Sequence, residues 1–416
     1  MSLNFRKIIQ LNRPRDIWNI NKSCGSYLVN QHNKKFIDFY TDFTPLGWNH
    51  PSFKTQMQTL SDDLFINKSN NFDSSLSNHY LNAFNSIVPD NFNVFFDNDH
   101  YNCISTALNL SLTWKSNFNS HNSINLDNLH ILHLNNFFNS HSISHQHHNT
   151  IHLDYFDNFL WSHLDYNSLI DNVDDTLFNL YEYNLNNHKN NNDIYECCLH
   201  HIDDQLFKIN SHNVAALIVS PVQFYDNKEH IDWYILKLFD YYCKKNNIIF
   251  IFDEFDSGFY STGKSWAFQH FDIHPDIVLF GKNSQHSGFF YNHKFDSLIH
   301  NYSPNFNLID LIRSTIINNI ILNDHLDDNV VINAKYLSCL LNNLHSNNIS
   351  NVKFLGGLLT FDLINIDQQD FLLNLYNYGL LVAPADNNSI RLTLNLNTTL
   401  DDIEHCANVI EHCLKN

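Results

Sequence analysis

Glycine is scarce in this sequence: only 9 of the 416 residues are glycine, whereas an average protein has about 7%. A chain with so few glycines is expected to use them where the backbone turns sharply or is approached closely, because only glycine lacks a Cβ atom. Four of the nine fall in one short stretch, at Gly258, Gly263, Gly281 and Gly288. We therefore expect the functional site in this stretch.

Positive charge is also scarce, since 24 Lys and Arg residues stand against 43 Asp and Glu residues and give a formal net charge of −19. An acidic surface repels phosphate groups, so nucleic acid and anionic membranes are not expected as partners. No run of 18 apolar residues occurs, which argues against a transmembrane helix. The first residues lack the continuous apolar stretch and small-residue cleavage site of a signal peptide.

The eight cysteines follow neither the spacing of zinc ligands nor that of a disulfide framework. Most lie in apolar surroundings and are expected to be buried thiols, which indicates a reducing, cytoplasmic location. Five histidines cluster between His141 and His152. Metal binding is one interpretation of this cluster, but no Cys or acidic residue has ligand spacing there. A polar loop is therefore favoured, and no metal site is predicted.

The chain is long enough, and with 43% hydrophobic residues apolar enough, for two packed domains. Unbroken apolar segments at 214–220, 248–254 and 276–281 predict buried strands, and a helical segment at 233–247 separates the first two. This order is typical of a parallel sheet that is covered on both faces. From about residue 308 the pattern changes and predicts a smaller α+β unit.

The segments before and after this centre have weaker patterns. Strands are expected at 94–98 and 129–134, with a helix at 103–116 between them. The His- and Asn-rich tract that continues to about residue 195 has little periodicity, and we assign it to irregular connections. The segment 308–344 has helical spacing throughout and is interpreted as one long helical stretch.

One acidic and one basic residue are predicted at the ends of neighbouring strands. Asp253 ends a buried strand, and Lys282 follows the next strand directly after Gly281. Ligands of open α/β sheets bind at this carboxyl edge. Pyridoxal-phosphate (PLP) chemistry needs such a pair, because the amine forms a Schiff base with the aldehyde and the carboxylate keeps the pyridine nitrogen protonated. Taken alone, however, the two residues are explained more simply by an ordinary salt bridge and a solvated lysine.

The surrounding residues favour the cofactor interpretation. Segment 250–282 contains a D-E-x-x-x-G-x-x-x-T-G pattern, an aromatic-rich stretch, a Pro-Asp-Ile strand and a Gly-Lys pair. In this it resembles the class III (ω-amino acid) aminotransferases. The matching residues are Asp253, Glu254, Gly258, Thr262, Gly263, Pro275, Asp276, Gly281 and Lys282. The sequence NSQHSG after the lysine, together with TWKS at 113–116 and NLIDLIR at 307–313, is similar to the lysine 6-aminotransferase branch.

The resemblance implies fold-type I of the PLP-dependent transferases. This is an α/β fold with a mostly parallel seven-stranded sheet in a large domain, next to a smaller α+β domain. Applied to this chain, it places an N-terminal segment, 1–52, against the small domain, a PLP-binding large domain at 53–298 and the C-terminal small domain at 299–416. It also implies a homodimer whose active sites take residues from both subunits, with an amino acid and a 2-oxo acid as substrates.

The resemblance further assigns roles to single residues. Lys282 would be the Schiff-base lysine and proton shuttle, and Asp253 the partner of the pyridine nitrogen. Phe138 would stack on the cofactor ring, and Ser303 would reach the phosphate of the partner subunit's cofactor. Arg391 would clamp the substrate carboxylate, because its planar fork binds carboxylates with two hydrogen bonds. From the residues alone, a surface ion pair is the alternative for Arg391.

Several positions depart from the family pattern. Asp99, His100 and Tyr101 stand where a small-residue turn before a helix holds the cofactor phosphate, and an aspartate there would repel that phosphate. His141 replaces an arginine that helps to hold the substrate carboxylate. Asp256 replaces a glutamine that hydrogen-bonds the phenolic oxygen of the cofactor, and its carboxylate would repel that oxygen.

Two functions remain open from the sequence. The first is an aminotransferase that moves the terminal amino group of L-lysine, or of a similar ω-amino acid, to 2-oxoglutarate. The second is a pseudoenzyme that keeps the fold and the dimer as a binding or structural protein. The altered positions 99–101 and 256 discriminate between them, because a loss of PLP binding there would favour the second function.

Overall fold

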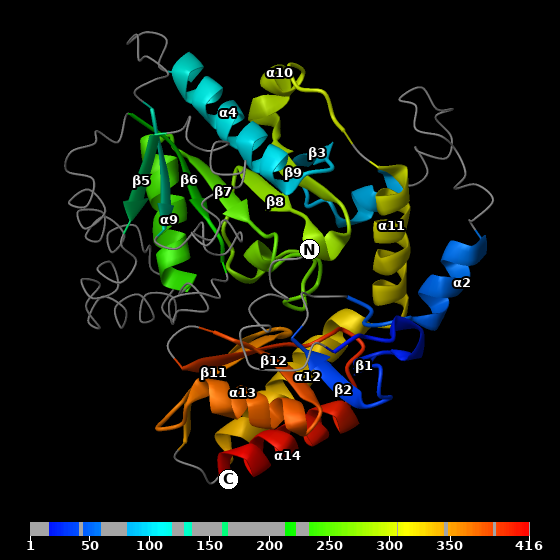
Figure 1. The fold of residues 1–416 in the computed structure, drawn as a ribbon. Helices are drawn as coiled ribbons and strands as arrows, with labels where there is room; N and C mark the ends of the chain where they lie inside the picture. The colour runs from blue at the N-terminus through cyan, green and yellow to red at the C-terminus, as the bar shows by residue number, and fades with distance from the viewer. Residues whose placement is uncertain are drawn as a thin grey trace, which may run out of the picture.

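The computed structural model describes residues 16–40, 45–59, 81–118, 129–134, 160–164, 213–221, 233–305, 307–344, 348–385 and 388–415. These residues form two units, each built on its own β-sheet. In Figure 1 the larger unit lies above the smaller one, and helix α11 (Leu308–Asn323) stands at the side of both.

A seven-stranded sheet in the order β3-β9-β8-β7-β6-β4-β5 forms the centre of the larger unit. Its strands are β3 (Phe92–Asp97), β4 (His130–Leu134), β5 (Leu160–Leu164), β6 (Val214–Val219), β7 (Ile249–Asp253), β8 (Ile277–Phe280) and β9 (Ser287–Asn292). From β8 to β5 all neighbouring strands are parallel, whereas β9 runs antiparallel to both β8 and β3. The prediction of a mostly parallel sheet is confirmed.

Two helices cover the opposite faces of this sheet. Alternate side chains of β6, β7 and β8 face α4 (His100–Phe118) on one side. The other set faces α9 (Trp233–Asn246) across the sheet. Every side chain of β6, β7 and β8 is buried, which is why these strands are continuous apolar runs in the sequence.

The smaller unit contains a six-stranded sheet in the order β1-β2-β12-β13-β11-β10. Its strands are β1 (Tyr27–Val29), β2 (Lys35–Phe39), β10 (Ile349–Leu355), β11 (Leu358–Leu363), β12 (Leu380–Pro384) and β13 (Ser389–Thr393). Its helices are α12 (Leu326–Asn342), α13 (Gln368–Asn377) and α14 (Leu400–Lys415), and Figure 1 shows α13 and α14 below the sheet. Because β2 pairs in parallel with β12, the two N-terminal strands belong to a sheet that is otherwise C-terminal.

Two expectations about secondary structure are wrong. The segment 308–344 is two helices, α11 and α12, separated at Asp324 and His325, where His325 has a left-handed φ of 52°. The tract assigned to irregular connections contains β5, which extends the sheet by pairing in parallel with β4. A five-residue edge strand with the sequence LWSHL is too short and too polar to show a strand period.

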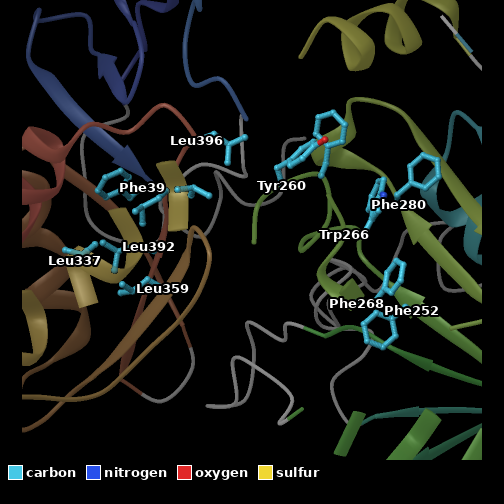
Figure 2. Close-up of a cluster of buried hydrophobic side chains, with 14 of the residues drawn as sticks. Phe39, Phe252, Tyr260, Trp266, Phe268, Phe280, Leu337, Leu359, Leu392 and Leu396 are labelled. Carbon is cyan, nitrogen blue, oxygen red and sulfur yellow. The ribbon is translucent and has the colours of Figure 1, made fainter. Parts of the chain in front are cut away.

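The hydrophobic core extends from the larger unit into the smaller one. Figure 2 shows aromatic side chains such as Trp266 and Phe280 on one side and aliphatic side chains such as Leu392 and Leu396 on the other. Trp266 is fully buried, its ring centroid lies 5.6 Å from that of Phe280, and its Nε1–H donates to the Ile87 carbonyl at 2.7 Å. Burying this polar group with a partner avoids the cost of an unmade hydrogen bond.

Four of the described cysteines are buried free thiols and two, Cys24 and Cys339, are exposed. The expectation of buried thiols is therefore confirmed for Cys103, Cys243, Cys406 and Cys413. Among the helices that the structure describes, none is both long enough and apolar enough to span a membrane.

Glu254, the second residue of the Asp-Glu pair, has a structural role. Its buried carboxylate accepts hydrogen bonds from the backbone N–H groups of Ala267, at 2.5 Å, and Phe268, at 2.7 Å. These N–H groups begin a short 3₁₀ helix (Ala267–His270), so Glu254 caps that helix and holds the aromatic segment against the sheet. Burial raises the pKa of Glu254 to about 8, although both N–H donors oppose this shift.

This raised pKa predicts a pH-dependent stability. Between pH 4.5 and 8 the folded protein binds more protons at Glu254 than the unfolded chain does, so the free energy of unfolding should fall as pH rises through this window. In Glu254→Gln the group no longer titrates, and the decline should be shallower, even though the variant is less stable overall. Denaturant midpoints at pH 5 and pH 8 measure the effect, with the exposed Glu404→Gln as control. An equal decline in Glu254→Gln and wild type would show that the carboxyl does not titrate in this window.

Candidate active site

Asp253 and Lys282 lie at the same edge of the larger sheet. Asp253 is the last residue of β7, and its backbone is paired with Leu279 of β8, three residues before Lys282. Because β7 and β8 are parallel, both side chains are placed at the carboxyl ends of their strands. The Asp253 side chain is fully buried, and that of Lys282 is 25% exposed.

The backbone around Lys282 turns sharply. Lys282 begins a short 3₁₀ turn (Lys282–Ser284) and has a left-handed φ of 42°, and Gln285 at its end has a φ of 62°. Such backbone angles are unfavourable for residues with a Cβ atom and are frequent at functional sites. Gly281, just before the turn, lets the Phe255 ring pack closely, because a Cβ at position 281 would lie 2.5 Å from that ring.

The amine of Lys282 forms an ion pair with Asp256. Lys282 Nζ donates to Asp256 Oδ1 at 2.5 Å, and the Asp256 side chain is 11% exposed. Asn283 fixes the loop that carries Asp256, since its Nδ2 donates to the carbonyls of Asp256, at 3.0 Å, and Gly258, at 3.2 Å. The carboxylate is thus held in place as the ion-pair partner of the lysine amine.

His100, the first residue of α4, lies over Phe255 and next to Asp253. The centroids of the His100 and Phe255 rings are 3.8 Å apart, and His100 Nε2 is 3.9 Å from Asp253 Oδ1. Only 8% of the His100 side chain is exposed. Phe255 itself contacts both catalytic candidates: its N–H donates to Asp253 Oδ1 at 3.1 Å, and Lys282 Nζ lies 5.9 Å from its ring centroid.

Asp99 caps the N-terminus of α4. Its Oδ1 accepts a hydrogen bond from the backbone N–H of Tyr101 at 2.8 Å, and its own N–H donates to Asp97 Oδ1 at 3.1 Å. The helix begins at His100 rather than near residue 103. Asp99 therefore precedes the helix, while His100 and Tyr101 belong to its first turn. A carboxylate in this position is stabilised by the positive end of the helix dipole.

The remaining predicted residues lie on other elements or outside the described ranges. Ser303 is exposed in the segment between α10 (Asp296–Ile299) and α11. Arg391 is half-buried on β13 of the smaller unit, where its backbone pairs with Thr360 and Ala383. Phe138 and His141, with the histidine cluster, fall outside the described residues. Within those residues, no group of His, Cys, Asp and Glu is arranged to hold a metal ion.

The structure thus brings together Asp253, Lys282, Asp256, His100 and Asp99. Phe255 and Asn283, for which no role was expected from the sequence, shape the same site. Their position in the sequence could have identified both residues, because each directly follows a residue of the family motif. The residue types carry no signal, because phenylalanine and asparagine are abundant in this chain.

Comparisons with known proteins identify the family of this chain. The model of the class-III aminotransferases matches residues 10–414. L-lysine-epsilon aminotransferase of Mycobacterium tuberculosis is 22% identical over 424 residues, which cover 96% of this chain and 91% of that protein. The 4-aminobutyrate aminotransferase of Dictyostelium discoideum is 34% identical over 164 residues, which cover 38% of this chain and 32% of that protein.

Solved structures show the same fold. Lysine aminotransferase from M. tuberculosis in the internal aldimine form matches with a TM-score of 0.81 and 21% identity, over 99% of this chain and 98% of that one. Acetylornithine aminotransferase from Elizabethkingia anophelis matches with a TM-score of 0.74 and 20% identity, over 99% of both chains. The prediction of fold-type I is confirmed. Because the family model spans nearly the whole sequence, this protein belongs to the class III aminotransferases, a family of PLP-dependent transaminases.

Proposed function

We propose that this protein uses PLP to move the terminal amino group of L-lysine, or of a similar ω-amino acid, to 2-oxoglutarate. One observation carries the proposal: the amine of Lys282 and the buried carboxylate of Asp253 lie at the ends of two adjacent parallel strands. The lysine preference is supported by similarity along 96% of the chain to proteins named for that activity.

The donor set of the site fits the reactive end of PLP. A buried carboxylate is stabilised by a cationic partner, and a protonated pyridine nitrogen is such a partner for Asp253. Lys282 supplies an amine that is partly exposed and can therefore be reached by the cofactor's aldehyde. When bound, PLP supplies the electron sink that stabilises a carbanion at the substrate carbon. The protein's part is to bind, orient and move protons.

Proton transfer is the task of Lys282. Nζ of Lys282 would carry the proton to and from the substrate carbon, as general acid–base catalysis requires. Asp256 Oδ1, 2.5 Å away, would accept a hydrogen bond from Nζ and orient the amine. Phe255 supports both residues, because its backbone N–H donates to Asp253 Oδ1 and its apolar ring lies next to Lys282 Nζ.

Further parts of the proposal extend the family pattern to this chain. We propose that Arg391 and His141 bind the substrate carboxylate, that Phe138 stacks on the cofactor ring, and that Ser303 acts in the partner subunit of a homodimer. The large domain would comprise residues 53–298, with 1–52 and 299–416 packed together as the smaller part. The buried thiols support a cytoplasmic location. The pseudoenzyme alternative has no support from the family or its relatives.

Glutamate formation tests the proposed reaction. Purified protein with added PLP, L-lysine and 2-oxoglutarate should produce glutamate, and omission of PLP after dialysis should reduce the rate. Lys282→Ala and Asp253→Ala should each nearly abolish turnover, the first by removing the amine and the second by removing the partner of the ring nitrogen. Circular dichroism serves as the folding control. Full turnover in Asp253→Ala would refute its role, and an absence of glutamate from every ω-amino donor tried would refute the proposal.

Arg391→Ala should raise the KM for the amino donor. A charge-assisted pair with a carboxylate contributes roughly 1.5–3 kcal/mol, which corresponds to about a tenfold to hundredfold change. The exposed Lys353→Ala, on the edge strand β10 of the same sheet, is the matched control for loss of a positive charge. Steady-state kinetics with lysine measure the effect, and an unchanged KM in Arg391→Ala would place the substrate carboxylate elsewhere.

A further inference from the structure

We infer that this protein closes its own cofactor site before PLP binds: the His100 imidazole takes the place of the cofactor ring, and the Asp99 carboxylate takes the place of its phosphate. The inference rests on the proposed use of PLP. In this arrangement the first turn of α4 is a gate, which must move for the cofactor to enter.

The ring position follows from the two ends that the cofactor must reach. A ring whose nitrogen pairs with Asp253 and whose aldehyde carbon bonds to Lys282 Nζ has to cross the space between these side chains. Phe255 lies between them, since its backbone N–H donates to Asp253 Oδ1 and its ring centroid lies 5.9 Å from Lys282 Nζ, and the face of this ring is where the cofactor would lie. His100 already lies on that surface, with ring centroids 3.8 Å apart and an interplanar angle of 34°.

The imidazole also reproduces the polar contact of the cofactor ring. His100 Nε2 lies 3.9 Å from Asp253 Oδ1, and both side chains are buried. An aromatic nitrogen next to this carboxylate, on an aromatic ring stacked against Phe255, has the same two partners as a bound pyridine ring. Two rings cannot occupy this space together, so His100 in this position and PLP are mutually exclusive.

The phosphate position is filled in the same way. A phosphate at the N-terminus of a helix is held by the N–H groups of the first turn. Here one of those groups, the N–H of Tyr101, donates to Asp99 Oδ1 at 2.8 Å. The carboxylate is an anion that belongs to the chain, and a second anion at the same donor would be repelled by it. Binding of the phosphate therefore requires that Asp99 release its cap.

Asp256 completes the closed arrangement, because its carboxylate neutralises the Lys282 amine at 2.5 Å. Each group that would hold PLP thus has a partner from the chain itself: Asp253 has His100, the helix has Asp99, and Lys282 has Asp256. Opening this set costs free energy, and the apparent dissociation constant rises by the inverse of the open fraction. PLP should consequently bind weakly, and slowly at saturating concentration.

The test compares PLP binding to the wild-type protein and to His100→Ala. Absorbance titration, followed by borohydride reduction and mapping of the label, should show adducts at Lys282 in both. His100→Ala should bind PLP about tenfold more tightly or better, because it removes the competing ring. In stopped flow, the observed rate for wild type should level off as PLP rises, since opening precedes binding. The rate for His100→Ala should keep rising.

Asn102→Ala, a change in the same helical turn, is the matched control and should behave as wild type. If His100→Ala does not fold, His100→Gln and the wild-type rate plateau decide the question. Equal affinity in wild type and His100→Ala, together with rates that rise linearly in both, would overturn the gate while leaving PLP use intact. Weaker binding by His100→Ala would overturn it as well, because His100 would then support the cofactor. If PLP labels Lys282 in neither protein, both the gate and the proposed function fail.

Discussion

The parallel pairing of β7 with β8 is the constraint on which the site depends. Parallel neighbours end at the same edge of a sheet, so Asp253 and Lys282 are brought together by backbone hydrogen bonds that involve neither side chain. The strands are fixed in turn by burial on both faces, between α4 and α9. The burial of the Asp253 carboxylate therefore follows from the pairing of the strands. The charged groups around it compensate for that burial.

In a site with few glycines, side chains occupy the space that a glycine-rich site leaves open to a ligand. Where small residues would leave backbone N–H groups open to an anion, this chain has Asp99 and His100, whose side chains occupy the space themselves. Where a Cβ atom would collide with a neighbour, glycine remains, as at Gly281 under the Phe255 ring. The acidic and basic groups of the site therefore pair with one another, which lowers the cost of burying them before any ligand arrives.

The sequence was sufficient for the central strands, because a strand that is buried on both faces is an unbroken apolar run. The sequence also predicted the positions of Asp253 and Lys282, which stand at the ends of such runs. The edge strand β5, by contrast, has a polar half and gains its order from β4. The direction of the His100 side chain was equally unpredictable, because it depends on where helix α4 begins relative to β7 and on the stacking of two rings that are 155 positions apart in the chain. Contacts of this kind are set by tertiary packing, which local patterns do not encode.

The central claim is that Asp253 and Lys282 together hold PLP at the edge of the sheet. A crystal structure of the protein grown with PLP tests it most directly. The account predicts continuous density from Lys282 Nζ to the cofactor, a ring nitrogen within hydrogen-bond distance of Asp253, and a His100 side chain that has left the face of Phe255. A cofactor bound elsewhere, or a ring at Lys282 whose nitrogen does not approach Asp253, would contradict it.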